Sequence, residues 1–215
     1  MTPTSVIIEE PTKPAITVDS LKLHLRIDNN EEDGLLEAII YAATARVEEY
    51  IDMKLIKQKW AIYWDSFLSK KKNEPWWDGT REMAIGELYN CNSKLDLPFG
   101  KVMGDDYSFS IMDGEGVYNV FDQSLYQVDG ISKQSRIALK TGGTWPSTSA
   151  PMNGIKFEAY FGFNEDEDKL PHAIKQALLI FCASMYENKG DEPLDMPMPQ
   201  ATTMLLAPYR SIRIS

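Results

Sequence analysis

The sequence contains few of the side chains that bind metal ions or form disulfides. Its 215 residues include two cysteines, Cys91 and Cys182, and two histidines, His24 and His172. Neither histidine lies near a pair of cysteines, so a zinc site of ordinary spacing is absent. Two cysteines this far apart are typical of reduced thiols in a cytoplasmic protein. We therefore predict no disulfide framework and no cofactor.

Long hydrophobic runs and a basic leader are also missing. The most apolar stretch, Gln176–Tyr186, is much shorter than the roughly 20 residues that span a bilayer. Residues 1–14 mix proline, threonine and glutamate, without a basic segment that leads into an apolar one. Neither a secretion signal nor a membrane span is predicted.

Positive charge is scarce. The formal net charge is −10, which argues against a protein that wraps nucleic acid with a basic face, because phosphate binding needs clustered Lys and Arg. An acidic wall past which DNA moves stays open, since like charges prevent sticking. The 43% hydrophobic and 11% aromatic content excludes a disordered chain.

Catalytic motifs are missing as well. Asp113–Gly116 reads as a hairpin turn and not as a phosphate loop, and no serine lies in a nucleophile elbow. The run from Asp28 resembles the start of a calcium loop, but Gly34 is one place late and Ile39 stands where glutamate is required. The acids at Glu165–Asp168 could hold a cation or serve as acid and base, but a solvated helix start is the favoured interpretation. No enzymatic activity is predicted.

The central element of the sequence is the stretch from Pro171 to Asn188. Its middle has no charged residue, and apolar side chains at helical spacing cover nearly its whole circumference, which predicts a buried helix. Pro171 suits a first helical turn, and Gly190 followed by Pro193 suits a helix end. We expect this helix to be the centre of a helical core.

Two further helices are predicted before it. Residues 1–14 read as an extended arm stiffened by prolines. One helix starts at Thr17, whose hydroxyl can cap it, and is expected to turn Leu21, His24 and Leu25 inward. A second, amphipathic helix runs from about Glu31. Its inward positions are expected to be Leu36, Ile39, Ile40, Ala43, Val47, Tyr50 and Ile51, and its outward positions mostly Glu37, Arg46, Glu48 and Glu49.

Strand signals occupy the middle of the chain. Trp60, Ile62 and Trp64 alternate with their neighbours, and two alternating runs flank the turn at 113–116, which predicts a hairpin. Further short strands are expected at 125–128, 136–139 and 155–163, whereas 68–93 has no clear pattern. The predicted fold class is α+β. Residues 1–57 and 164–215 form a helical bundle core, and residues 58–163 form an inserted antiparallel β-sandwich or barrel-like domain.

The C-terminal tail differs in composition from the rest of the chain. Asp191–Pro199 is proline-rich and predicts a semi-rigid linker, followed by a short helical turn at 204–207. Residues 208–214 are apolar and basic without an acid. Two interpretations stay open: the tail folds back on its own domain, or it docks on an acidic or grooved partner by strand addition or as a short helix.

Six short strings, in this order over nearly the whole chain, resemble the adaptor group of tailed-phage head-tail connector proteins that carries a β insertion. They are "LKLHLRID" at Leu21–Asp28, "LDLP" at Leu95–Pro98, "YQVD" at Tyr126–Asp129, "WP" at Trp145–Pro146, "YEN" at Tyr186–Asn188 and "LLAPYR" at Leu205–Arg210. The segment 68–93 is longer than the family pattern.

The resemblance implies a structural protein of the virion neck, assembled in the host cytoplasm, without a catalytic step. In such families the subunits form a ring of about twelve with heterologous interfaces. The ring lies between the portal protein and a stopper or tail-completion protein, and DNA passes through its channel without sequence-specific binding. Carried onto this chain, the implied portal-binding residues are Leu205, Leu206, Pro208, Tyr209 and Arg210, with Ile212, Arg213 and Ile214 as an extension.

Two other functions stay open. A β-sandwich carbohydrate-binding module would use Trp76 and Trp77 to stack on sugar rings. A metal-dependent hydrolase would use the acids near Glu165.

Overall fold

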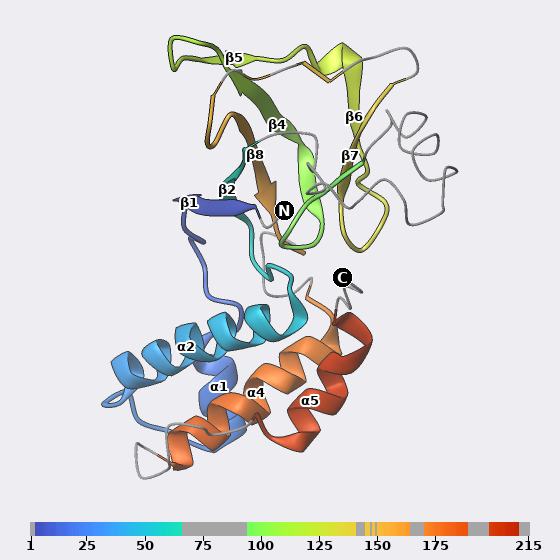
Figure 1. Ribbon diagram of the computed structural model, residues 1–215. Helices are drawn as coiled ribbons and strands as arrows, with labels where there is room; N and C mark the ends of the chain where they lie inside the picture. Colours follow the sequence, from blue (N-terminus) through green and yellow to red (C-terminus); the bar gives the residue numbers. More distant parts are fainter. Residues whose placement is uncertain are drawn as a thin grey trace, which may run out of the picture. The chain divides into compact units, whose positions relative to one another are not determined.

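The computed structural model describes residues 3–65, 94–140, 145–146, 148, 150–163, 170–188 and 198–210. The chain divides into two compact units (Figure 1). The helical unit comprises Glu10–Gln58, Pro98–Met103 and Phe161–Ser215, and the β unit comprises Met1–Glu9, Lys59–Leu97 and Gly104–Tyr160. The α+β class predicted from the sequence is confirmed.

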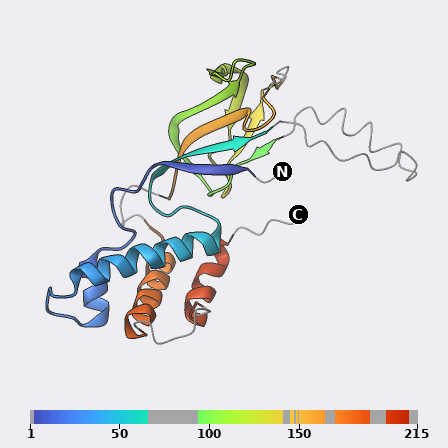
Figure 2. The same ribbon diagram turned by 60° about the vertical axis from the view of Figure 1, so that its left-hand side comes forward.

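The helical unit is organised around one central helix, as predicted. Helix α4 (His172–Glu187) packs against α1 (Val18–Leu25), α2 (Asp33–Ile51) and α5 (Gln200–Leu206). Figure 1 shows α4 between α2 and α5, and Figure 2 shows it between α1 and α5. Its side chains Leu178 and Cys182 are fully buried. The buried residues of α4 lie on one face, whereas Leu179 and Ile180 on the other side are half-buried, so the burial predicted for this helix applies to one face.

Helix α1 begins where the sequence predicts, because the Thr17 hydroxyl accepts a hydrogen bond from the Ser20 backbone N–H at 3.2 Å. The predicted inward position of His24 is wrong, since His24 is exposed. Lys22 is buried instead, and its Nζ donates to Asn30 Oδ1 at 2.6 Å and forms an ion pair with Asp33. A lysine stem packs as an apolar chain while its ammonium reaches polar groups at the edge.

Helix α2 buries the apolar stripe that its spacing predicts, but Glu48 is a correction. It was expected to point mostly outward, and only 8% of it is exposed. Its Oε1 accepts hydrogen bonds from the Leu55 backbone N–H at 2.8 Å and from Gln58 Nε2 at 3.2 Å. Its Oε2 accepts one from Lys54 Nζ at 3.0 Å. Glu48 therefore holds the chain as it leaves α2.

The strands of the β unit form two sheets. The order of the five-stranded sheet is β1-β2-β8-β4-β5, and that of the three-stranded sheet is β3-β7-β6. The strands are β1 (Thr4–Glu9), β2 (Gln58–Trp64), β3 (Leu95–Asp96), β4 (Val102–Met112), β5 (Tyr118–Val120), β6 (Tyr126–Val128), β7 (Arg136–Leu139) and β8 (Ile155–Phe161). The predicted hairpin is confirmed, with β4 and β5 antiparallel and Ser110 opposite Val120.

Aromatic side chains from both sheets share one core. Phe109 on β4 is fully buried, and its ring lies 6.2 Å from that of Phe157 on β8 and 5.5 Å from that of Tyr126 on β6. Trp145 adds a ring at 5.6 Å from Phe109. Burial raises the pKa of Tyr126 to about 12. Rings at these distances add to the hydrophobic gain of burial, so the cluster joins the sheets.

Strand β1 was not expected. The prolines of residues 1–14 predict an extended arm of the helical core, whereas Thr4–Glu9 pairs antiparallel with β2. Tyr160 on β8 donates its hydroxyl hydrogen bond to Glu9 at 3.0 Å. The prolines that suggested an arm, Pro3 and Pro11, flank the strand and leave its ladder hydrogen bonds intact.

The loop Pro98–Met103 groups with the helical unit, although its neighbours on both sides are in the β unit. The Phe99 carbonyl accepts a hydrogen bond from the Lys54 N–H at 3.0 Å, and the Phe99 ring meets Phe161 edge-on at 5.7 Å. Gly100 has a φ of +85°, and a Cβ there would lie 2.9 Å from the Met53 side chain. Only glycine fits this approach.

Candidate functional site

The predicted portal-binding segment is a short helical element folded onto the helical unit. Helix α5 follows Pro199 and continues into a 3-10 turn, Ala207–Tyr209. Proline at the start of that turn costs no hydrogen bond, because the first N–H groups of a helical turn have no internal partner. The helix begins earlier than the predicted turn at 204–207 and is longer.

One side of this element belongs to the core. Leu206 and Thr202 are fully buried, and the Thr202 hydroxyl donates to the Ala177 carbonyl of α4 at 3.5 Å. Leu205 and Tyr209 are half-buried, and the Tyr209 ring meets Phe163 edge-on with centroids 6.3 Å apart. Of the two interpretations of the tail, the fold-back applies to residues 198–210.

The other side is exposed. Pro208 and Arg210 lie on the surface, and the Arg210 guanidinium sits 5.2 Å from the centre of the Tyr50 ring of α2. A cation over an aromatic face at an exposed site is worth about 0.5–1 kcal/mol. This contact favours one orientation of the exposed Arg210 side chain. The guanidinium can donate two parallel hydrogen bonds to a carboxylate.

The structure thus divides the eight predicted portal-binding residues. Leu206 is a core residue, Leu205 and Tyr209 are shared between core and surface, and Pro208 and Arg210 are exposed. Ile212, Arg213 and Ile214 lie outside the described residues, as does most of the predicted linker. Tyr50 and Phe163, which contact Arg210 and Tyr209, were not predicted as parts of the site. The only feature of the sequence that could have indicated them is an aromatic residue at the end of α2 and another just after β8.

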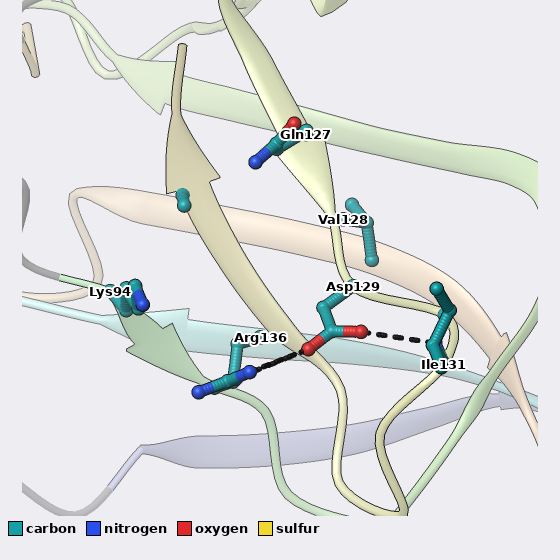
Figure 3. Close-up of a pocket in the computed structure, with 8 residues that line it drawn as sticks. Lys94, Gln127, Val128, Asp129, Ile131 and Arg136 are labelled. Atoms are coloured by element: carbon teal, nitrogen blue, oxygen red, sulfur yellow. Dashed lines mark hydrogen bonds and ion pairs between the residues drawn. The ribbon is translucent and has the colours of Figure 1, made fainter. Parts of the chain in front are cut away.

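A second polar arrangement lies in the β unit, where a pocket of about 330 Å³ surrounds Asp129 and Arg136. Figure 3 shows the Asp129 carboxylate between Arg136 and the backbone of Ile131. Asp129 Oδ2 accepts from Arg136 Nη2 at 2.7 Å and from the Ser132 hydroxyl at 2.7 Å. Hydrogen bonds from Arg136, then from Ser132 and the Ile131 N–H, hold the pKa of Asp129 well below its ordinary value. Both charged groups are engaged, so the pair fixes the turn between β6 and β7.

This pair predicts a pH dependence. A carboxyl whose pKa is lowered on folding stabilises the fold above its unfolded pKa, near 3.8, and loses that contribution as pH falls toward the folded value. Asp129→Asn is therefore expected to lower the urea midpoint at pH 7 more than at pH 3. Asp105→Asn, at an exposed position of β4, is the matched control. An equal effect of Asp129→Asn at both pH values would contradict the assignment.

The described residues offer little for metal or nucleophilic chemistry. No group of three or more His, Cys, Asp or Glu side chains among them could hold a metal ion. The Cys182 thiol is buried in α4, and burial raises its pKa to about 12, which keeps it protonated. The acids near Glu165 and the pair Trp76 and Trp77 lie outside the described residues. Within those residues, no helix is long and apolar enough to cross a bilayer.

Solved structures share this fold. A chain from the neck of an empty gene transfer agent (GTA) particle, computed with C6 symmetry, is similar at a TM-score of 0.70 and 21% identity. A chain from the virion of the native GTA particle is similar at 0.71 and 20% identity, and one from the neck of the native particle with C12 symmetry at 0.68 and 19%. Each likeness covers 100% of this chain and 98% of the other.

The sequence also matches a particular family. A model of phage gp6-like head-tail connector proteins matches residues 15–74, which include α1 and α2. The resemblance to head-tail connector proteins predicted from the sequence is confirmed by this match. No curated relative matches the chain. Nothing in these comparisons supports the carbohydrate-binding alternative.

Proposed function

We propose that the chain is a structural head-tail connector, an adaptor in the neck of a phage-like particle. The observation that carries the proposal is the likeness of the whole chain to chains of neck structures, together with the independent match of residues 15–74 to connector proteins. The activity is assembly, without a catalytic step.

In this proposal the subunits form a ring of about twelve between the portal and a stopper or tail-completion protein. The helical unit is the core of each subunit, and the β unit, which takes its edge strand β1 from the N-terminus, is an inserted β-sandwich or barrel-like domain. The C6 and C12 symmetry of the similar neck structures supports a cyclic assembly. The net charge of −10 suits a channel through which DNA moves without binding.

The attachment to the portal is assigned to the end of the C-terminal segment, Leu205, Leu206, Pro208, Tyr209 and Arg210, with Ile212, Arg213 and Ile214 beyond it. The exposed Arg210 is the side chain most able to bind a partner directly, because arginine often dominates interface energies. Leu206 contributes indirectly, since it holds α5 on α4.

Arg210→Ala is expected to weaken portal binding about tenfold, corresponding to about 1.4 kcal/mol. The free energy of unfolding of the free protein should change little, because the side chain is exposed. The measurement is the affinity of the purified variant for the purified portal protein. Arg26→Asn is the control, since it also removes an exposed charge from the helical unit and asparagine tolerates the left-handed backbone there (φ 59°). If Arg210→Ala binds the portal with undiminished affinity, Arg210 is not part of the interface.

Electron microscopy of particles made after disruption of the gene tests the function itself. Separate tails and tailless heads that lose DNA are expected if the chain joins head to tail. Normal infectious particles would overturn the proposal.

A further inference from the structure

The two outer strands of the five-stranded sheet expose apolar side chains. On β1, Val6, Ile7 and Ile8 are exposed by 52%, 36% and 46%. Successive residues of a strand point to opposite faces, so β1 is uncovered on both faces. At the other edge, Val120 of β5 is 75% exposed and Val117 just before it is 55% exposed.

Over most of their length, both edges lack the charges and prolines that protect an edge strand. Native proteins place lysine, proline or inward charges on such strands to prevent pairing with another chain. Residues 4–8 and 116–121 contain no charged side chain and no proline. Within the described residues, β1 pairs only with β2 and β5 only with β4. The outward N–H and C=O groups of both strands are available to another strand.

We propose that β1 of one subunit pairs with β5 of the next, so that neighbouring copies of this chain join their five-stranded sheets. The two edges are different surfaces at opposite ends of one sheet. A contact between two different surfaces is heterologous, and repeated copies close into a ring when the rotation allows it. The inference rests on the proposed ring and assigns one of its contacts.

The charge of the chain favours a second copy as the occupant. Copies with a net charge of −10 repel one another, and an uncharged edge is where they meet with the least repulsion. Acidic groups follow the apolar part of each edge, at Glu9, the last residue of β1, and at Asp122, after β5. Strand addition supplies affinity through backbone hydrogen bonds, and the exposed valines and isoleucines supply apolar contact.

The pairing is small. Strand β5 has three residues, so this contact alone buries much less than the roughly 1,600 Å² of a stable standard interface. It is therefore weak between two free copies. In a closed ring every subunit makes it twice, once at each edge. Assembled particles are accordingly the right sample for its test.

The test is cysteine cross-linking in purified particles, with Cys91 replaced by serine in every variant. Cys182 does not interfere, because it is buried and its raised pKa keeps it unreactive. The variant Val6→Cys with Val120→Cys, treated with a short bis-maleimide, is expected to give a ladder of multimers. Each single variant should give no cross-linked product. Particles that mix the two single variants should give dimers and nothing larger.

A matched control pairs Val6→Cys with Ile131→Cys, because Ile131 is 96% exposed but lies in the turn between β6 and β7. No ladder is expected from it. Particles that contain the chain but give no Val6–Val120 cross-link would overturn the edge pairing and leave the connector function standing. Dimers from Val6→Cys alone would also overturn it, since they require β1 to meet β1. Particles that lack the chain would overturn both the edge pairing and the connector function.

Discussion

Replacement of Glu48 with alanine is expected to lower the free energy of unfolding by about 3 kcal/mol. The carboxylate is buried and accepts hydrogen bonds from the Leu55 N–H, Gln58 and Lys54. Alanine leaves these donors without their acceptor, and a buried donor that loses its acceptor carries the full cost of desolvation. Helix propensity works in the opposite direction, because alanine is the best helix former. A urea titration followed by the helical circular dichroism signal measures the change.

Glu49→Ala is the matched control for this prediction. Glu49 is the next residue, its side chain is 74% exposed, and its bond with Arg46 spans 3.3 Å at the surface. An exposed pair of this kind is worth roughly 0.3–0.5 kcal/mol. Equal losses in Glu48→Ala and Glu49→Ala would show that the network around Glu48 does not hold the exit of α2.

The elements that local patterns predict are the ones whose cause is local. The apolar circumference of α4, the Thr17 cap and the hairpin turn at Asp113 each depend on neighbours within a few residues. The Asp113 carboxylate accepts the N–H groups of Glu115 and Val117 at 2.9 and 3.0 Å. Local elements of this kind can be predicted from a sequence, because the spacing of neighbouring residues alone determines them.

The features that were missed depend on distant segments. Glu48 lies on the polar side of an ordinary amphipathic pattern, and only the return of the chain at Leu55 and Gln58 makes it a buried acceptor. Strand β1 needs β2, which lies more than fifty residues later in the sequence. The loop Pro98–Met103 reads as a link between strands, and no pattern in it indicates that it belongs with the helices.

The strings that carried the family resemblance now have physical explanations. The aspartate of "YQVD" is Asp129, which fixes the turn between β6 and β7 through Arg136 and Ser132. The tyrosine of "YEN" is Tyr186, whose hydroxyl donates to Glu32 just before α2. The second leucine of "LDLP" is Leu97, which is fully buried. These strings predict the fold well, because they contain residues that the fold needs.

The same reasoning limits what "LLAPYR" says about a binding site. A string that resembles a family locates a segment, but it does not separate side chains that hold the segment in place from those that meet a partner. Burial separates them here: Leu206 is fully buried, whereas Arg210 is exposed. Substitution of each residue therefore has a different expected consequence.

Leu206→Ala is expected to lower the free energy of unfolding of the helical unit by about 3 kcal/mol, within the usual range for a leucine removed from a core. Leu206 is the only residue of α5 and the following turn in the buried apolar cluster of the described residues. Its loss leaves a cavity against α4, and a seven-residue helix is not stable by itself in water. Helix α5 should therefore open locally, which hydrogen exchange of its amides detects.

Met204→Ala is the control for this variant, because Met204 lies on the same helix and is 65% exposed. It should leave both stability and amide exchange nearly unchanged. Portal binding then distinguishes the two roles within one motif. Leu206→Ala should reduce binding together with amide protection in α5, whereas Arg210→Ala should reduce binding with protection intact. If Leu206→Ala exposes the α5 amides and still binds portal at full affinity, the folded helix is not what the portal recognises, and the attachment must lie elsewhere in the chain.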